Sequence, residues 1–200
     1  MIKPITNKAM LIILSAPSGG GKTSIAKKLL KEDANLSLSI SATTRKPRSG
    51  EQEGVDYFFV NRAEFDLLIA EDQLLESAEI YYNLYGTPKK NVERVLASGA
   101  DLLFDIDSQG AYQIMNKMQE RVLSIFILPP DIATLRERLE ARGQDDIETL
   151  NLRIKLAQEE MEHAKNYQHV VINDNFDKAI HEIQAIIHKE RQKREMHEDR

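Results

Sequence analysis

The chain has 200 residues, 42% of them hydrophobic, and its 27 basic and 32 acidic residues give a net charge of −5. A chain of this size suits one compact domain, and the net negative charge argues against general nucleic-acid binding. The absence of cysteine excludes disulfides and thiolate metal sites and favours a reducing compartment.

The first predicted element is a buried strand over residues 10–15, a short apolar run that ends at a glycine cluster. The run is too short to span a bilayer, and the glycines that follow it do not suit a signal-peptide cleavage site. We therefore expect a soluble, cytoplasmic protein that contacts no membrane. A helix is predicted over residues 23–31, so strand, glycine-rich loop and helix open an α/β fold.

Further strands and helices alternate along the rest of the chain. Buried strands are predicted over residues 100–106, 121–128 and 170–173. Helices are predicted over residues 91–98, 114–118, 131–141, 147–165 and 177–194. Strands that alternate with helices at this spacing indicate a parallel sheet covered by helices on both faces.

Two stretches interrupt the alternation. Residues 37–90 combine short strands at 38–41 and 57–60 with a helix at 62–71, which indicates an inserted lobe. Residues 138–153 are charged and carry three arginines between two helices, which suggests a mobile flap. The charged residues 188–200 predict a solvated helix end that frays.

Residues 16–23, A-P-S-G-G-G-K-T, follow the phosphate-binding P-loop pattern except at the first position. Glycines let successive backbone N–H groups face phosphate oxygens, and the N-terminus of the next helix favours negative charge. Lys22 can neutralise charge on a transferring phosphoryl group, and the Thr23 hydroxyl can bind Mg²⁺. Ala16 replaces the usual glycine, so its backbone must avoid positive φ or adjust slightly.

A regulatory GTPase is the alternative P-loop protein. Such a protein needs a D-x-x-G motif and an N-K-x-D motif that binds guanine. Residues 107–110 supply D-S-Q-G, and Asn116 and Lys117 follow. Gln119 stands where the aspartate belongs, however, and the two motifs are too close to lie on different strands. We therefore expect Asn116 and Lys117 to be helix-surface residues.

The inserted lobe carries two arginines three positions apart, Arg45 and Arg48, beside several hydroxyl groups. Arginine binds phosphate oxygens with two parallel hydrogen bonds, so this pair could clamp a second phosphate. Tyr57, Glu76, Tyr85 and Thr87 follow in the same lobe.

Taken together, the motifs make the chain similar to bacterial guanylate kinases over about residues 9–190. The resemblance rests on the P-loop, S-A-T-T-R-K-P-R at 41–48, G-V-D-Y-F-F at 54–59, L-E-S-A at 75–78 and Y-G-T-P at 85–88. It continues with D-I-D-S-Q-G at 105–110, I-L-P-P at 127–130, R-L-E-A-R-G at 138–143 and V-V-I-N-D at 170–174.

The resemblance implies a P-loop NTPase fold in one domain, with a core of residues 1–36, 91–133 and 163–200, a GMP-binding lobe at 37–90 and a mobile lid at 134–162. It implies transfer of a phosphoryl group from ATP to GMP with Mg²⁺ as cofactor, and no nucleic-acid partner. The sequence does not indicate an oligomeric state.

The resemblance also implies roles for individual residues. The GMP phosphate would contact Ser41, Arg45, Arg48, Tyr57 and Tyr85. The guanine base would contact Glu76, Thr87 and Asp107, because carboxylates accept hydrogen bonds from guanine N1 and N2 whereas AMP would leave them unpaired. The ATP site would comprise Ala16, Pro17, Ser18, Gly19, Gly20, Gly21, Lys22, Thr23, Ser24 and Asn173.

For the reaction, the resemblance implies catalytic roles for Lys22, Arg45, Arg138, Arg142 and Arg153. Mg²⁺ would contact Thr23 directly and Asp105 through water. Besides Ala16, the sequence departs from the usual family pattern at Leu84 and Pro88, which neighbour the nucleotide edge without removing a named contact. A binding module that no longer catalyses is a third possibility, but Lys22 and the lid arginines argue against it.

Overall fold

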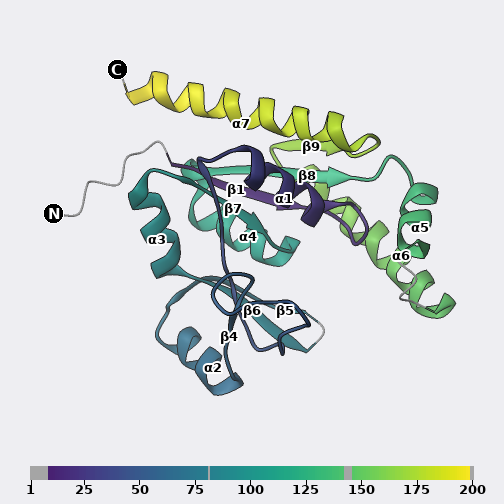
Figure 1. Ribbon diagram of the computed structural model, residues 1–200, viewed down its shortest axis with the longest axis horizontal. Helices are drawn as coiled ribbons and strands as arrows, with labels where there is room; N and C mark the ends of the chain where they lie inside the picture. The colour runs from purple at the N-terminus through teal and green to yellow at the C-terminus, as the bar shows by residue number, and fades with distance from the viewer. Residues whose placement is uncertain (1–8, 81, 142–145, 199–200) are drawn as a thin grey trace.

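The computed structural model describes residues 9–80, 82–141 and 146–198 of the chain. Its centre is a five-stranded parallel sheet in the order β2-β7-β1-β8-β9 (Figure 1). The strands are β1 Leu11–Ser15, β2 Leu36–Leu38, β7 Asp101–Asp105, β8 Val122–Leu128 and β9 His169–Ile172. Because the strands are parallel, their carboxyl ends lie along one edge, where ligands of open α/β sheets bind.

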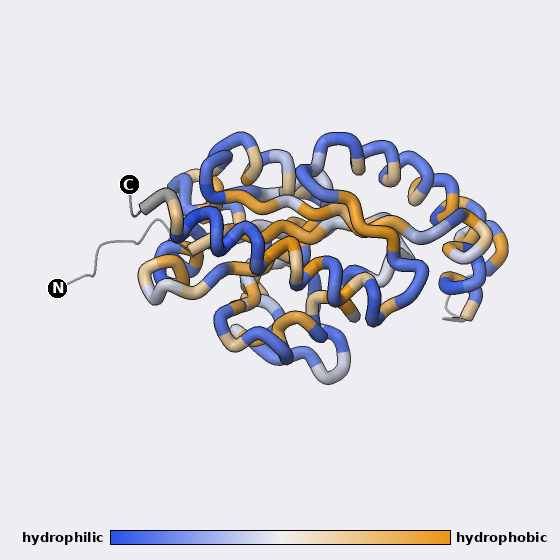
Figure 2. The backbone as a smooth tube through the Cα atoms, turned by 90° about the horizontal axis from the view of Figure 1, so that it is seen from above, coloured by the Kyte–Doolittle hydropathy of each residue, from blue (hydrophilic) through white to orange (hydrophobic). Residues whose placement is uncertain are grey.

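Side chains of the central strand β1 alternate between two hydrophobic cores. Ile12 and Leu14 pack with helices α1 (Lys22–Glu32) and α7 (Phe176–Glu198) on one face. Leu11 and Ile13 pack with α3 (Lys89–Ser98) and α4 (Ser108–Lys117) on the other. A strand buried on both faces is continuously apolar, which is why the sheet forms the orange centre of Figure 2 and the helices around it are largely blue.

A smaller sheet forms the inserted lobe, which lies below the main sheet in Figure 1. Its strand order is β4-β3-β6-β5, and helix α2 (Arg62–Ala70) packs on it. The strands are β3 Ala42–Thr43, β4 Phe58–Phe59, β5 Leu74–Ile80 and β6 Asn83–Pro88. Phe65 of α2 is fully buried with Ala42, Leu74 and Leu84, so the lobe has a hydrophobic core of its own.

Two antiparallel helices follow β8 and project from one side of the sheet (Figure 1). These are α5 (Ile132–Glu140) and α6 (Ile147–Met161), and they pack through Leu135, Leu139 and Ile154 in a separate small core. Short 3₁₀ turns, η1 Gln119–Arg121 and η2 Glu162–Asn166, precede β8 and β9. None of the helices in the described part of the chain combines the length and apolarity needed to cross a bilayer.

The fold confirms the predicted α/β class, and the main strands and helices lie within a few residues of their predicted bounds. The strand predicted at 38–41 is wrong. Leu36–Leu38 pairs with β7 in the main sheet, whereas Ala42–Thr43 pairs with β4 and β6 in the lobe. Residues 39–41 connect the two sheets, which local patterning could not reveal because both strands are short.

The sequence analysis missed the two longest lobe strands, β5 and β6. The alternation in β5 is broken by Glu76, a charged residue that the fold buries to 3% exposure. A charged residue at a core-facing position interrupts the alternation of apolar and polar residues by which a strand is recognised. Such departures from the pattern are common at functional sites. Helix α4 begins at Ser108 rather than 114, because Asp107 caps it by accepting a hydrogen bond from the Gly110 N–H.

The prediction for residues 188–200 is wrong at Arg191. Helix α7 continues to Glu198, and Arg191 donates hydrogen bonds to Asp33 and to Asp101, each at 2.7 Å. Asp101 is almost fully buried and also accepts the Met10 N–H at 2.7 Å. This part of the charged tail therefore fastens α7 to the start of β7 and the end of α1.

Replacing Arg191 with alanine should lower the free energy of unfolding by about 2–3 kcal/mol, because it leaves the buried Asp101 carboxylate without its cation. Lys193→Ala is the matched control, since the exposed Lys193 forms an ion pair with Glu190 of the same helix, and should cost less than about 1 kcal/mol. Urea unfolding at neutral pH measures both. Equal losses in the two variants would show that the Arg191 network does not stabilise the fold.

Candidate active site

The loop of residues 16–21 joins the end of β1 to the start of α1, at the centre of the main sheet. Gly19 and Gly21 have φ values of 90° and 94°, which other residues rarely adopt. Gly21 also lacks room for a side chain, since a Cβ there would lie 2.5 Å from Nδ2 of Asn173. The glycines therefore let the loop turn tightly and present the N-terminus of α1 to the cavity beside it.

Ala16 occupies the position where a P-loop usually has glycine. Outside glycine, Asp72 and Tyr82 are the described residues with positive φ, so Ala16 has an ordinary backbone conformation. A Cβ at Gly20 would lie 2.9 Å from the Ala16 methyl group. Because Gly20 has no side chain, the methyl group of Ala16 fits beside it.

Lys22 lies in the first turn of α1 and extends toward the end of β7. Its Nζ donates a hydrogen bond to the Ile106 carbonyl at 2.7 Å and forms an ion pair with Asp105 at 2.9 Å. These contacts hold the ammonium group at the carboxyl ends of β1 and β7. Without a nucleotide, the charge of Lys22 is balanced by Asp105.

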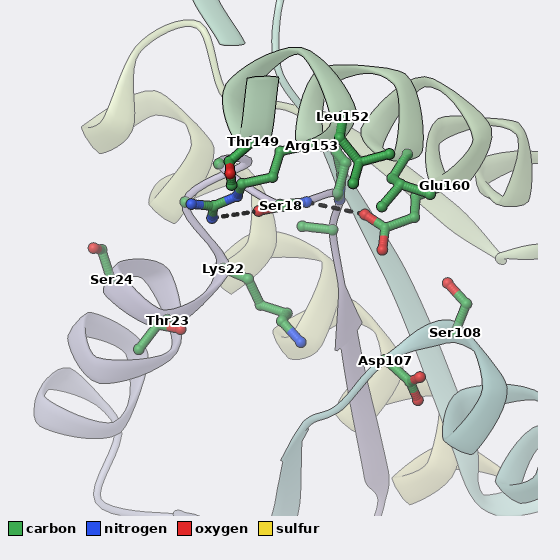
Figure 3. Close-up of a pocket in the computed structure, with 15 residues that line it drawn as sticks. Ser18, Lys22, Thr23, Ser24, Asp107, Ser108, Thr149, Leu152, Arg153 and Glu160 are labelled. Atoms are coloured by element: carbon green, nitrogen blue, oxygen red, sulfur yellow. Dashed lines mark hydrogen bonds between the residues drawn. The ribbon is translucent and has the colours of Figure 1, made fainter. Parts of the chain in front are cut away.

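A cavity of about 570 Å³ adjoins the loop, a size typical of small-molecule sites. Figure 3 shows its three sides: the glycine-rich loop with α1, the start of α4 at Asp107 and Ser108, and one face of α6. From α6 it is lined by Thr149, Leu152, Arg153, Leu156 and Glu160. The cavity is therefore enclosed by elements of the main sheet and of the α5–α6 pair together.

Helix α6 is bonded to the loop at Ser18. Arg153 donates to the Ser18 hydroxyl at 2.8 Å, and the Ser18 N–H donates to the Glu160 carboxylate at 3.0 Å (Figure 3). Sequence analysis selected Arg153 but missed Glu160. The seven-residue spacing places both on one face of α6, which is the signal that could have identified Glu160.

Asn173 and Arg138 meet on another side of the loop. The buried Asn173 donates to the Gly20 carbonyl at 2.9 Å, and Arg138 donates to the Asn173 carbonyl at 2.8 Å. Arg138 Nη1 and Asn173 Oδ1 are buried without a hydrogen-bond partner among the described residues. Buried polar atoms are nearly always paired in proteins, so these two atoms are available to a ligand.

The predicted guanine-binding residues come from three elements and meet between the lobe and α4. Thr87 of β6 donates to the Glu76 carboxylate of β5 at 2.8 Å, and both residues are buried. Asp107 caps α4 nearby. Burial raises the pKa of Glu76 to about 7; the hydrogen bond from Thr87 opposes this rise, and the Asp107 charge adds to it. The buried Glu76 and the partly exposed Asp107 together present carboxylate oxygens that can accept hydrogen bonds from N–H donors.

Three of the predicted phosphate-binding residues also come together. The ring centroids of Tyr57 and Tyr85 are 6.0 Å apart, and the Arg45 guanidinium lies 5.2 Å from the Tyr57 ring centroid. Ser41 directly precedes β3, and Tyr57 directly precedes its parallel neighbour β4. Burial raises the pKa of the Tyr57 phenol, so it remains a neutral hydrogen-bonding group.

Both arginines of the predicted clamp, Arg45 and Arg48, bond to the carboxylate of Glu51. Arg45 makes two hydrogen bonds to the Glu51 carboxylate, at 2.8 and 3.0 Å. Arg48 has an exposed side chain, and its backbone N–H donates to the same carboxylate at 2.7 Å. Glu51 was missed by sequence analysis; an acidic residue six positions after an arginine in a loop was its only signal.

Three further residues were singled out in the sequence. Arg142 lies outside the described residues. Asn116 and Lys117 are exposed on α4, as expected, but Lys117 also donates to the Leu75 carbonyl at 2.7 Å. Both lie near the end of α4 opposite to Asp107, so they are separate from the phosphate loop.

Comparisons with known proteins agree with this arrangement. A family model described as guanylate kinase matches residues 8–190. A guanylate kinase of Rickettsia bellii is 53% identical over 94% of this chain and 98% of its own length, and one of Rhizobium meliloti is 45% identical over 96% and 87%. A crystal structure of guanylate kinase from Anaplasma phagocytophilum matches with a TM-score of 0.75 and 38% identity, over 92% of this chain and 86% of that one.

The raised pKa of Glu76 predicts a pH-dependent stability. Its pKa is about 7 in the folded chain and near 4.5 in the unfolded chain, so its stabilising contribution is complete below pH 4.5 and is lost as the pH rises through 7. Unfolding measurements from pH 4.5 to 7.5 should show the parent protein losing roughly 2–3 kcal/mol relative to Glu76→Gln.

The exposed Glu79→Gln on the same strand provides the control, because it changes one carboxylate of β5 without touching the buried site. Its pH profile should follow that of the parent protein. An identical pH profile for Glu76→Gln and the parent would show that Glu76 titrates normally.

Proposed function

This chain belongs to the guanylate kinase family, and on that premise we propose that it transfers the γ-phosphoryl group of ATP to GMP, giving ADP and GDP. The observation that carries the proposal is the position of Asp107. It lines the cavity beside the phosphate loop and also lies next to the buried Glu76 carboxylate. Asp107 is therefore common to the cavity beside the phosphate loop and to the site that we assign to guanine.

On the ATP side, we assign the phosphates to the loop of residues 16–21 and the first turn of α1 through Ser24. Backbone N–H groups of a glycine-rich loop at a helix N-terminus bind phosphate oxygens. Arg153 reaches the loop at Ser18, and Arg138 and Asn173 offer unpaired polar atoms beside it. We assign these three residues to ATP binding and to stabilising the charge of the transition state.

On the GMP side, the polarity of the site favours guanine over adenine. Guanine donates hydrogen bonds from N1 and N2, which Glu76 and Asp107 can accept, and Thr87 holds the Glu76 carboxylate in place. Adenine carries an acceptor at N1 and would leave the carboxylates unpaired in a buried site, which a protein discriminates against strongly.

We assign the GMP phosphate to the cluster of Tyr57, Tyr85, Ser41 and Arg45, with Arg48 at its exposed side. The Arg45 guanidinium is paired with Glu51, so Glu51 holds the arginine fork in one orientation beside Tyr57. A guanidinium group has five N–H donors, so Arg45 can bond to Glu51 and still donate to a phosphate oxygen.

The transfer itself needs no strong general base, because a phosphate monoester is already largely dianionic near neutral pH. Catalysis then consists of aligning the acceptor oxygen with the γ-phosphorus and neutralising charge. Lys22 is held at the meeting point of the two substrate sites by Asp105 and Ile106. Nucleotide phosphates would attract its ammonium group away from Asp105.

Mg²⁺ is the cofactor that we propose for ATP. No group of three or more histidine or carboxylate side chains that could form a complete metal cage occurs among the described residues. Mg²⁺ characteristically takes one or two protein ligands, several waters and substrate phosphates. The Thr23 hydroxyl at the cavity and the Asp105 carboxylate at the end of β7 suit that pattern. Bound there, the ion would neutralise phosphate charge.

We propose that the lobe of residues 37–90 and the lid of residues 134–162 move relative to the core during catalysis. The lobe and the α5–α6 pair each have a hydrophobic core of their own, so each can keep its internal structure during such a movement. Closure would exclude water as a competing acceptor of the phosphoryl group.

Substrate selectivity tests the assignment of guanine. With ATP and Mg²⁺ present, GMP should stimulate ADP formation far more than AMP, CMP or UMP, because only guanine matches the acceptor site. A coupled assay of ADP release measures this directly. Equal rates with AMP would overturn the proposal, and ADP release that GMP does not increase would indicate a simple nucleotidase.

Lys22→Ala should lower kcat by about 100-fold or more, since it removes the cation placed to neutralise the transferring group. Lys27→Ala is the matched control, because Lys27 is exposed on the same helix. It should retain the parent kcat. A near-normal kcat for a folded Lys22→Ala variant would contradict the role assigned to the loop.

A further inference from the structure

Gly110 is the third residue of α4 and lies three positions after the Asp107 cap. It has no positive φ, and its N–H donates to Asp107 at 3.0 Å, so its backbone is ordinarily helical. Alanine would fit that conformation and is a better helix former than glycine. Neither the backbone nor helix stability therefore calls for glycine at this position, and the reason must lie in the space around it.

That space is filled by the Glu76 carboxylate. A Cβ at position 110 would lie 2.6 Å from Glu76 Oε2 and 3.1 Å from its Cδ. The same Cβ would lie 3.5 Å from Asp107 Oδ1. Gly110 is thus the point on the helix surface where the two carboxylates assigned to guanine approach each other, and a methyl group there would displace one of them.

Glu76 is held against Gly110 from its other side. Its second carboxylate oxygen accepts the Thr87 hydroxyl at 2.8 Å, and the residue is only 3% exposed. The carboxylate therefore lies between β6 and α4. To reach solvent it would have to turn away and lose the hydrogen bond from Thr87.

Helix α4 also fixes the backbone on both sides of Glu76. The Gln113 amide donates to the Ser77 carbonyl at 2.7 Å and accepts the Ser77 N–H at 3.2 Å. Lys117 donates to the Leu75 carbonyl at 2.7 Å. Gly110, Gln113 and Lys117 are three and four residues apart and so share one face of the helix. This face belongs to the main domain but contacts β5 of the lobe.

We propose that Gly110 is a specificity-determining residue of the guanine site and that Gln113 is a positioning residue for it. Gly110 provides the space in which the Glu76 carboxylate lies beside Asp107, and Gln113 sets the register of β5 so that Glu76 reaches that space. The inference rests on the proposed function, since it takes Glu76 and Asp107 as the groups that bind guanine.

The first test is Gly110→Ala. The Michaelis constant for GMP should rise about tenfold or more, because binding and catalysis are sensitive to displacements of less than 1 Å. The preference for GMP over AMP should fall. The Michaelis constant for ATP should not change. The midpoint of thermal unfolding should fall, because the methyl group forces a buried, hydrogen-bonded carboxylate to move, and this cost outweighs the helix preference of alanine.

A double-variant cycle with Glu76→Ala shows whether Gly110 acts through Glu76. Once Glu76 is shortened, the methyl group at 110 has no carboxylate to displace, so Gly110→Ala should add little to the effect of Glu76→Ala. An undiminished effect of Gly110→Ala in that background would overturn the proposal. So would an unchanged Michaelis constant for GMP in the single Gly110→Ala variant.

Gln113→Glu is the second test, and it keeps the proposal falsifiable if Gly110→Ala does not fold. A carboxylate can still accept the Ser77 N–H but cannot donate to the Ser77 carbonyl, so β5 should shift. The Michaelis constant for GMP should rise severalfold while kcat at saturating GMP and the Michaelis constant for ATP are retained. Asn116→Asp, the same chemical change at an exposed position of α4, should leave all three unchanged. Equal behaviour of the two variants would overturn the role of Gln113.

The outcomes separate this inference from the proposed function. If Glu76→Ala itself leaves the Michaelis constant for GMP unchanged, the assignment of guanine to Glu76 is wrong and the inference fails with it. If Glu76→Ala impairs GMP binding but Gly110→Ala and Gln113→Glu do not, the proposed function stands and only the role of α4 is overturned.

Discussion

The parallel pairing of β1 with β7 is the interaction on which the site depends. Its register places Leu14 opposite Asp105, so the glycine-rich loop after β1 and the acidic residues after β7 begin at the same edge of the sheet. Lys22 bridges them through Asp105 and the Ile106 carbonyl. Apolar burial on both faces of the sheet holds this register, because a slip of one residue would exchange the two cores.

Buried and partly buried charged groups in the described part of the chain include Asp101, Arg45 and Glu76. Asp101 is matched by Arg191, and Arg45 is matched by Glu51. Glu76 accepts a hydrogen bond from the Thr87 hydroxyl, and burial raises its pKa to about 7. Burial of this carboxyl group lowers stability near neutral pH, since its ionised form is poorly solvated in the folded protein.

The phosphate loop is held by elements that come from distant parts of the chain. Asn173 after β9 bonds to Gly20, and Arg153 and Glu160 of α6 bond to Ser18. Helix α4 reaches the lobe in the same way through Gln113 and Lys117. Leu75 of β5 also packs in the main hydrophobic core beside α4, while the lobe and the α5–α6 pair each have a further hydrophobic core of their own. Such an arrangement suits parts that keep their internal structure while their mutual contacts change.

The sequence by itself predicted the α/β class, most strands of the main sheet and the glycine-rich loop, because each follows from local periodicity or from an ordered motif. The other candidate site residues were predicted from the resemblance to a family. The sequence did not determine that residues 36–38 and 42–43 belong to different sheets, that Arg45 is paired with Glu51, or that Gly110 adjoins Glu76. Each of these contacts is between residues that strand pairing and helix packing bring together. Only the tertiary structure decides them. The sequence shows that position 110 is a glycine, but it does not show which side chain of another element packs against that glycine.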